Sequence, residues 1–258
     1  MLALSPLLSL LTSGQVDVCN QPCESDVQCP DSRGVCTYCT QNTCQPPRGC
    51  VGGPRTPNTT KPQLLVIGDS ISIGWSPVLF PLLTHYESQH VPTNAGPASK
   101  GFACARTWVG NVSWDVVLWN FGLHSLDRHR LPDGSATLPT SEAETLANYT
   151  RELQAIAQVL KQHSRRVIWV DTTPVPLNVT TGPERHNQYV IQFNAAANAV
   201  MNSLGIQTSD VYGAVMTVCP ATSGPPDQTY ASCRIQSPGG VHFPGHYDVL
   251  VAALYRCV

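Results

Sequence analysis

The stretch from Gln63 to Trp75, QLLVIGDSISIGW, joins a buried strand to a turn that carries a serine. Residues 64–67 form a short, uninterrupted apolar run rich in branched side chains, the pattern of a strand buried on both faces. The tripeptide Gly68-Asp69-Ser70 follows, and after it comes a mostly apolar segment that can begin a helix. Such a serine lies at the carboxyl edge of a sheet, where open α/β folds place reactive groups, and near helix N–H groups that favour a developing negative charge. Asp69 or Ser70 can equally well only cap the helix, so the tripeptide leaves both interpretations open.

Strand-length apolar runs alternate with longer helical patterns through the rest of the chain. Strands are expected at 64–68, 115–121 and 166–171 and near Ile206, and helices at 74–85, 141–163, 187–204 and 245–256. Because strands separated by helices need crossover connections, the alternation predicts a parallel sheet between two layers of helices. The expected fold class is therefore a three-layer α/β/α domain over residues 63–258.

Composition limits the partners and suggests the compartment. Charged residues make up 12% of the chain and the net charge is −2, so no basic field exists for nucleic acid or an anionic membrane. Residues 1–16 include a leucine-rich stretch that is too short to span a bilayer and fits a signal peptide, and no later segment has the uninterrupted apolar length of a membrane span. The 11 cysteines and the N-x-[ST] sequons favour an oxidising secretory route, so we expect a soluble secreted protein. Candidate glycosylation sites are Asn58, Asn111, Asn148 and Asn178.

Residues 17–52 are a cysteine-rich segment with too few apolar residues to build a core, so disulfides are expected to hold it together. Zinc binding is the competing interpretation because Cys36 and Cys39 have ligand spacing, although no histidine or second C-x-x-C pair completes a site nearby. The segment resembles the cystine-knot miniproteins typified by plant carboxypeptidase inhibitors. That resemblance implies the pairs Cys19–Cys36, Cys23–Cys39 and Cys29–Cys44. Residues 53–62 are a linker by composition.

Candidate functional residues cluster in loops that follow the strands or precede the last helix. Besides Ser70, these loops are Asn94-Ala95-Gly96-Pro97, Asn120-Phe121-Gly122-Leu123-His124 and Gly239-Gly240-Val241-His242-Phe243. A glycine such as Gly96 lets the backbone approach a ligand closely. Loops at one edge of an α/β sheet can converge on a single crevice, so these segments are expected to form one site.

These four segments, in this order, resemble the blocks of the SGNH/GDSL hydrolase superfamily of esterases and lipases over about residues 62–258. The resemblance implies that Ser70 is the nucleophile and His242 the catalytic base. It implies that the backbone N–H groups of Ser70 and Gly96 line the oxyanion hole, and it aligns Gly122-Leu123-His124 with the third block. It also implies a flavodoxin-like sheet and a reaction that needs neither a metal nor an organic cofactor.

Two residues depart from the superfamily pattern. His124 stands where an oxyanion asparagine is usual; a neutral imidazole can donate one N–H, and Asn120 is the alternative donor. Both side chains can instead only hold the loop together. Gly239 stands where an aspartate usually orients the base, so a backbone carbonyl or an acid from elsewhere has to replace it. Losing an orienting group lowers the rate without removing the mechanism.

The leading hypothesis is a secreted esterase that acts on small acyl or acetyl esters of a small molecule or a glycan. One alternative is a weakly active or inactive SGNH-fold protein that binds carbohydrate, consistent with the missing acid. A second alternative treats residues 17–52 as a protease inhibitor carried on a scaffold. The sequence does not indicate an oligomeric state.

The cysteines outside the proposed knot give one further expectation. Cys219–Cys233 closes a short loop and is the favoured pair. Cys257 is expected to fasten the last helix to Cys50 or Cys104, which leaves one free thiol or an intermolecular link.

Overall fold

The computed structural model describes residues 38–40, 43–45, 50, 53–55, 57, 59–126, 129–130, 136–137, 142–177, 179, 185–219 and 234–258. The chain divides into two compact units, Met1–Arg48 and Gly49–Val258. In the first unit, strands β1 (Tyr38–Thr40) and β2 (Thr43–Gln45) pair antiparallel. The predicted signal peptide lies outside the described residues. Each of the three predicted knot disulfides involves a cysteine outside them, so all of these stay predictions.

The second unit is built on a parallel sheet of five strands in the order β4-β3-β5-β8-β9. Numbered along the chain, these strands follow the order 2-1-3-4-5 of flavodoxin-like sheets, as the sequence predicts. Their bounds are β3 (Gln63–Ile67), β4 (Glu87–His90), β5 (Trp114–Trp119), β8 (Ser164–Val170) and β9 (Gln207–Ser209). Two short strands, β6 (His129–Arg130) and β7 (Ala136–Thr137), form a separate antiparallel pair.

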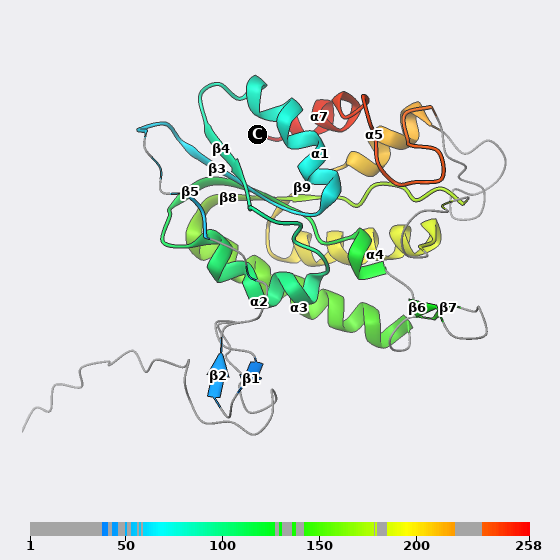
Figure 1. Cartoon of the computed structure of the whole chain (residues 1–258), viewed down its shortest axis with the longest axis horizontal. Coiled ribbons are helices and arrows are strands. Elements are labelled where there is room, and N and C mark those ends of the chain that lie inside the picture. Colours follow the sequence, from blue (N-terminus) through cyan, green and yellow to red (C-terminus); the bar gives the residue numbers. More distant parts are fainter. Residues whose placement is uncertain are drawn as a thin grey trace, which may run out of the picture. The chain divides into compact units, whose positions relative to one another are not determined.

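Helices cover both faces of the sheet, and the predicted three-layer architecture is confirmed. Figure 1 shows α1, α5 and α7 over one face and α2, α3 and α4 over the other. The helices are α1 (Ser70–Leu79), α2 (Ala98–Val109), α3 (Glu142–His163), α4 (Asn187–Ser203), α5 (Val211–Val218) and α7 (Asp248–Tyr255), with short 3-10 turns η2 (Phe80–Leu82) and η3 (Leu123–Leu126).

The core lies between the sheet and these helices. Every residue of β3 is buried, in agreement with the apolar run that predicts a central strand. Trp119 and Trp169 are paired across β5 and β8, and their ring centroids lie 4.8 Å apart in an edge-to-face contact. Paired residues of neighbouring strands point to the same face, and Thr208, the partner of Trp169 on β9, donates a hydrogen bond to Asn198 of α4, so both rings lie on the face that α4 covers. Among the described residues, no helix is long and apolar enough to cross a membrane.

Several elements differ from the sequence prediction. The helix expected from residue 74 begins at Ser70 and continues past Pro77 to Leu79. The predicted elements do not include β4, α2 or α5. Strand β4 has the sequence ESQH, which lacks an apolar pattern because it is the edge of the sheet.

The disulfide expectation for Cys257 is wrong. Cys50 is bonded to Cys104 on α2, with a Cα–Cα distance of 5.4 Å, and Cys257 is a free cysteine. The reason is the layer order: α2 lies on the face of the sheet opposite α7, which precedes Cys257 (Figure 1). Cys219 is disulfide-bonded as expected, and its predicted partner Cys233 lies outside the described residues.

Candidate active site

The turn between β3 and α1 presents Ser70 at the first position of the helix. Asp69 is the N-cap: its Oδ1 accepts a hydrogen bond from the Ile71 N–H at 2.9 Å, and its carbonyl accepts one from Ser72 Oγ at 2.7 Å. Gly68 is required because a Cβ there would lie 2.6 Å from Ser72 Oγ. The cap is therefore Asp69, which leaves the Ser70 hydroxyl for other contacts, and the role of Ser70 as nucleophile stays a prediction.

His242 meets Ser70 although 172 residues separate them. Its Nε2 lies 2.8 Å from Ser70 Oγ, which is the contact that a serine and its general base make. The carbonyl of His242 accepts a hydrogen bond from the Ser237 N–H at 2.8 Å, which fixes the loop. Tyr247 then packs over Gly74 of α1, where any Cβ would overlap the Tyr247 hydroxyl. This close approach holds the His242 loop over the start of α1.

The loop with Gly96 lies beside the serine turn, because the Ala95 N–H donates to the Gly68 carbonyl at 2.9 Å. Gly96 has φ +69°, in the region that favours glycine. Its N–H, an expected oxyanion donor, donates to Asn94 Oδ1 at 2.9 Å. An oxyanion at this position therefore has to displace the Asn94 side chain before it reaches the Gly96 N–H.

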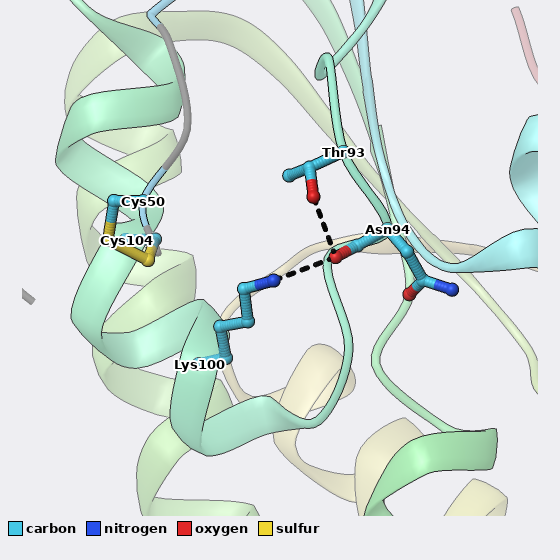
Figure 2. The surroundings of a disulfide bond; sticks show 5 residues. All are labelled: Cys50, Thr93, Asn94, Lys100 and Cys104. Carbon is cyan, nitrogen blue, oxygen red and sulfur yellow. Dashed lines mark hydrogen bonds between the residues drawn. A yellow bond between two sulfur atoms is a disulfide. The ribbon is translucent and has the colours of Figure 1, made fainter. Parts of the chain in front are cut away.

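Helix α2 supports this loop through a lysine. Lys100 Nζ donates to the Asn94 carbonyl at 2.9 Å, and Thr93 Oγ1 donates to the same oxygen at 3.3 Å (Figure 2). Cys104 lies one helical turn after Lys100 and is bonded to Cys50, as Figure 2 shows. The disulfide and the loop are thus attached to the same helix.

Asn120 connects three neighbouring strands. Its N–H donates to the Ile67 carbonyl at 3.0 Å, and its side-chain Nδ2 lies 2.6 Å from the Val170 carbonyl and 3.3 Å from Thr172 Oγ1. Its Oδ1 accepts from the Gly122 N–H at 3.0 Å. Since the side-chain amide already has these partners, Asn120 holds the loop, and the oxyanion role of His124 stays a proposal. His124 is half-buried in η3.

No carboxylate stands three residues before His242, because that residue is Gly239. Asp69, next to Ser70, carries a buried carboxyl instead. Gly239 lies in a turn closed by a hydrogen bond from the Gly240 N–H to the Ser237 carbonyl at 3.0 Å. Asp69 is 2% exposed, and burial raises the pKa of its carboxyl, while the nearby charges of His124, Arg185 and His242 lower it.

Sequence reasoning missed Arg185, which is buried and donates from Nε to the Leu123 carbonyl at 2.9 Å. Nothing in its local sequence marks it, because its closeness to Asp69 arises only in the folded chain. Among the described residues, no group of three or more His, Cys, Asp or Glu side chains is placed to hold a metal ion.

Comparison with known proteins supports the fold through structure alone. No family model matches the chain, and no curated protein matches its sequence. A GDSL-like lipase from Bacteroides thetaiotaomicron aligns with TM-score 0.56 and 18% identity over 79% of this chain and 91% of that one. A lipase/acylhydrolase from Enterococcus faecalis aligns with TM-score 0.55 and 20% identity over 76% and 94% of the two chains. A member of the lipolytic G-D-S-L family from Veillonella parvula gives TM-score 0.51 and 12% identity over 75% and 96%.

These identities are low, so the comparisons establish the fold alone. The sheet and its flanking helices have the SGNH hydrolase fold.

Proposed function

We propose that this chain is a secreted serine esterase that hydrolyses carboxylic esters of small acyl groups, including acetyl groups on carbohydrate. The observation that carries the proposal is the 2.8 Å contact between Ser70 Oγ and His242 Nε2. It lies at the N-terminus of α1, where backbone N–H groups favour negative charge. The likeness of fold to GDSL-like lipases supports the same class of reaction.

The chemistry follows from this contact. Neutral His242 takes the proton of Ser70 through Nε2, and Ser70 Oγ attacks the ester carbonyl carbon. The N–H groups of Ser70 and Gly96 and the imidazole of His124 stabilise the resulting oxyanion. His242 then returns the proton to the leaving alcohol, and a water molecule repeats the sequence on the acyl-enzyme, so that the acid is released and Ser70 restored.

Secretion and glycosylation are part of the proposal. The Cys50–Cys104 bond supports an oxidising compartment, where disulfides persist. Asn111 is exposed, as a glycosylated asparagine has to be. Mass spectrometry of the protein from the culture medium, before and after removal of N-glycans, tests both statements.

The activity is tested with a short-chain aryl acetate and purified full-length protein. Ser70→Ala is expected to lose at least about a thousandfold in kcat/KM, because the nucleophile is removed. Ser203→Ala is the matched control, since Ser203 is exposed at the end of α4. A fluorophosphonate probe should add its mass to the parent protein and to Ser203→Ala, and not to Ser70→Ala. Equal activity of the parent and Ser70→Ala would disprove the proposal.

The alternative function, an SGNH-fold protein that binds carbohydrate without turning it over, is favoured by Gly239. A folded parent protein that retains acetylated xylan on an affinity column, and neither hydrolyses aryl acetate nor reacts with the probe, would establish this alternative.

A further inference from the structure

A second contact between a serine and a histidine lies next to the turn that carries Ser70. Ser72, in the first turn of α1, has its Oγ 2.7 Å from Nε2 of His90, the last residue of β4. Ser72 is only 3% exposed, so its hydroxyl cannot reach a substrate as a nucleophile. Any effect of this pair on a reaction has to pass through the groups that it contacts.

The Ser72 hydroxyl has one proton and two neighbouring acceptors. Its Oγ also lies 2.7 Å from the Asp69 carbonyl oxygen, and His90 Nδ1 lies 2.6 Å from the Val91 carbonyl oxygen. Because a carbonyl only accepts, the contact with Val91 requires a proton on Nδ1. A neutral imidazole then has no proton on Nε2, so Nε2 competes with the Asp69 carbonyl for the Ser72 proton. A protonated imidazole donates from Nε2 to Ser72 Oγ, and all three contacts become hydrogen bonds at once.

The Asp69 carbonyl is directly connected to the proposed oxyanion hole. It belongs to the same planar peptide group as the Ser70 N–H. A hydrogen bond to the carbonyl polarises this group and strengthens its N–H as a donor, by about 10–30% for one further bond in a chain. The direction in which the Ser72 hydroxyl points therefore changes the N–H of Ser70.

We propose that Ser72 and His90 form a hydrogen-bond switch that sets the donor strength of the Ser70 N–H. Neutral His90 accepts the Ser72 proton on Nε2. Protonated His90 donates to Ser72 Oγ instead, and the Ser72 hydroxyl then donates to the Asp69 carbonyl. Both are positioning residues, because they act only through the peptide group between Asp69 and Ser70. The effect on oxyanion stabilisation rests on the proposed esterase function, whereas the switch itself does not.

The surroundings of His90 contain one charged group in the turn beside it. The two elements that hold His90 are β3, which pairs with β4, and α1, and neither contains a charged residue. Residues 91–97 contain no titratable side chain. Burial lowers the pKa of His90, while the Val91 carbonyl and the charge of Asp69 raise it. His90 is therefore neutral near pH 7 and gains its second proton at acidic pH.

The test follows the Ser70 amide proton by NMR in full-length protein that carries His242→Ala, so that the proposed base does not titrate. The ring nitrogen shifts of His90 give its tautomer and its midpoint. As the pH falls through that midpoint, the Ser70 amide proton is expected to move downfield in one step, because its peptide group gains a hydrogen bond. A neutral His90 without a proton on Nδ1 would overturn the proposal.

Two variants in the same protein fix the two states of the switch. Ser72→Ala keeps the charge of His90 and removes the hydroxyl, so the step in the Ser70 amide should disappear while His90 still titrates. His90→Leu leaves the Asp69 carbonyl as the acceptor for the Ser72 hydroxyl, so the amide should stay at its downfield position at every pH. His85→Gln is the matched control, since His85 is exposed before β4, and it should leave the step unchanged.

A step of equal size in Ser72→Ala would overturn the switch, because it would show that the charge of His90 acts through space. An amide that stays at its upfield position in His90→Leu would overturn it as well. Asp69 is present in all of these proteins, so its own titration contributes equally to each.

The consequence for the reaction is measured separately, with His242 intact and aryl acetate as substrate. At pH 7, His90→Leu is expected to raise kcat about twofold or more with KM little changed, because a stronger donor acts mainly on the transition state. An unchanged kcat would overturn the catalytic role and leave the switch. A parent that hydrolyses no ester but shows the step that depends on Ser72 would disprove the esterase and leave the switch standing.

Discussion

Replacing Asp171 by asparagine should stabilise this protein, and the gain should grow with pH. Asp171 follows β8 and is 6% exposed. Its carboxylate accepts hydrogen bonds from Trp169 Nε1 at 3.1 Å and from Asn198 Nδ2 at 3.4 Å. These hydrogen bonds lower the pKa of Asp171, but burial and the neighbouring charge of Asp210 raise it more, from 3.8 to about 7.

The sign and size of the effect follow from linkage. The folded protein holds this proton to higher pH than the unfolded chain, so stability falls as pH rises from the unfolded pKa toward 7. With a shift from 3.8 to about 7, the penalty is at most about 2 kcal/mol at pH 5 and about 4 kcal/mol at pH 8. The asparagine side chain keeps an acceptor for Trp169 and loses the longer bond to Asn198, which costs about 1 kcal/mol. The net gain is therefore about 1 kcal/mol at pH 5 and about 3 kcal/mol at pH 8.

The assay is urea unfolding followed by tryptophan fluorescence, at pH 5 and pH 8, with parent and Asp171→Asn measured side by side. Equal m-values are required, so that the change in midpoint reports stability. Asp210→Asn removes only the second cause and should give a smaller gain with the same pH dependence. A difference between parent and Asp171→Asn that is equal at both pH values would refute the reasoning, because only titration makes the gain grow.

Two further changes test the architecture around the site. Cys50→Ser with Cys104→Ser opens a loop with a sequence separation of 54 and should reduce the free energy of unfolding by about 2–4 kcal/mol in non-reducing urea titrations; an unchanged midpoint would contradict this role. Gly74→Ala should lower kcat/KM more than about tenfold because its Cβ would overlap the Tyr247 hydroxyl and push the His242 loop away. The double variant Gly74→Ala with Tyr247→Ala should recover part of the loss, and a double variant no better than the single one would rule out the steric explanation.

The elements that the sequence predicts well are those whose signal is contiguous. The apolar run before Ser70 identifies β3 because a strand covered on both faces is apolar at every position. The ordered blocks also place Ser70, Gly96 and His242 in neighbouring loops, and the 2.8 Å contact between Ser70 and His242 shows how closely two of them meet. Their chemical roles remain proposals.

The other parts of the fold and of the site depend on tertiary contacts that no local sequence pattern indicates. The sequence places His124 first and Asn120 second as side-chain donor, and only the folded chain shows that the Asn120 amide donates to the Val170 carbonyl. The Cys257 pairing is wrong because cysteine order does not reveal which face of the sheet each cysteine occupies. Arg185 is brought toward Asp69 by the fold alone.

The bond between Cys50 and Cys104 also has a mechanical consequence. Any tension applied to the chain before Cys50 passes through the sulfur atoms into α2, and not along the segment that leads into β3. Hydrogen bonds in β3 are therefore relieved of a pulling force that covalent bonds carry instead. If the N-terminal segment is attached to a moving or crowded surface, the strand that positions Ser70 is not peeled from its sheet.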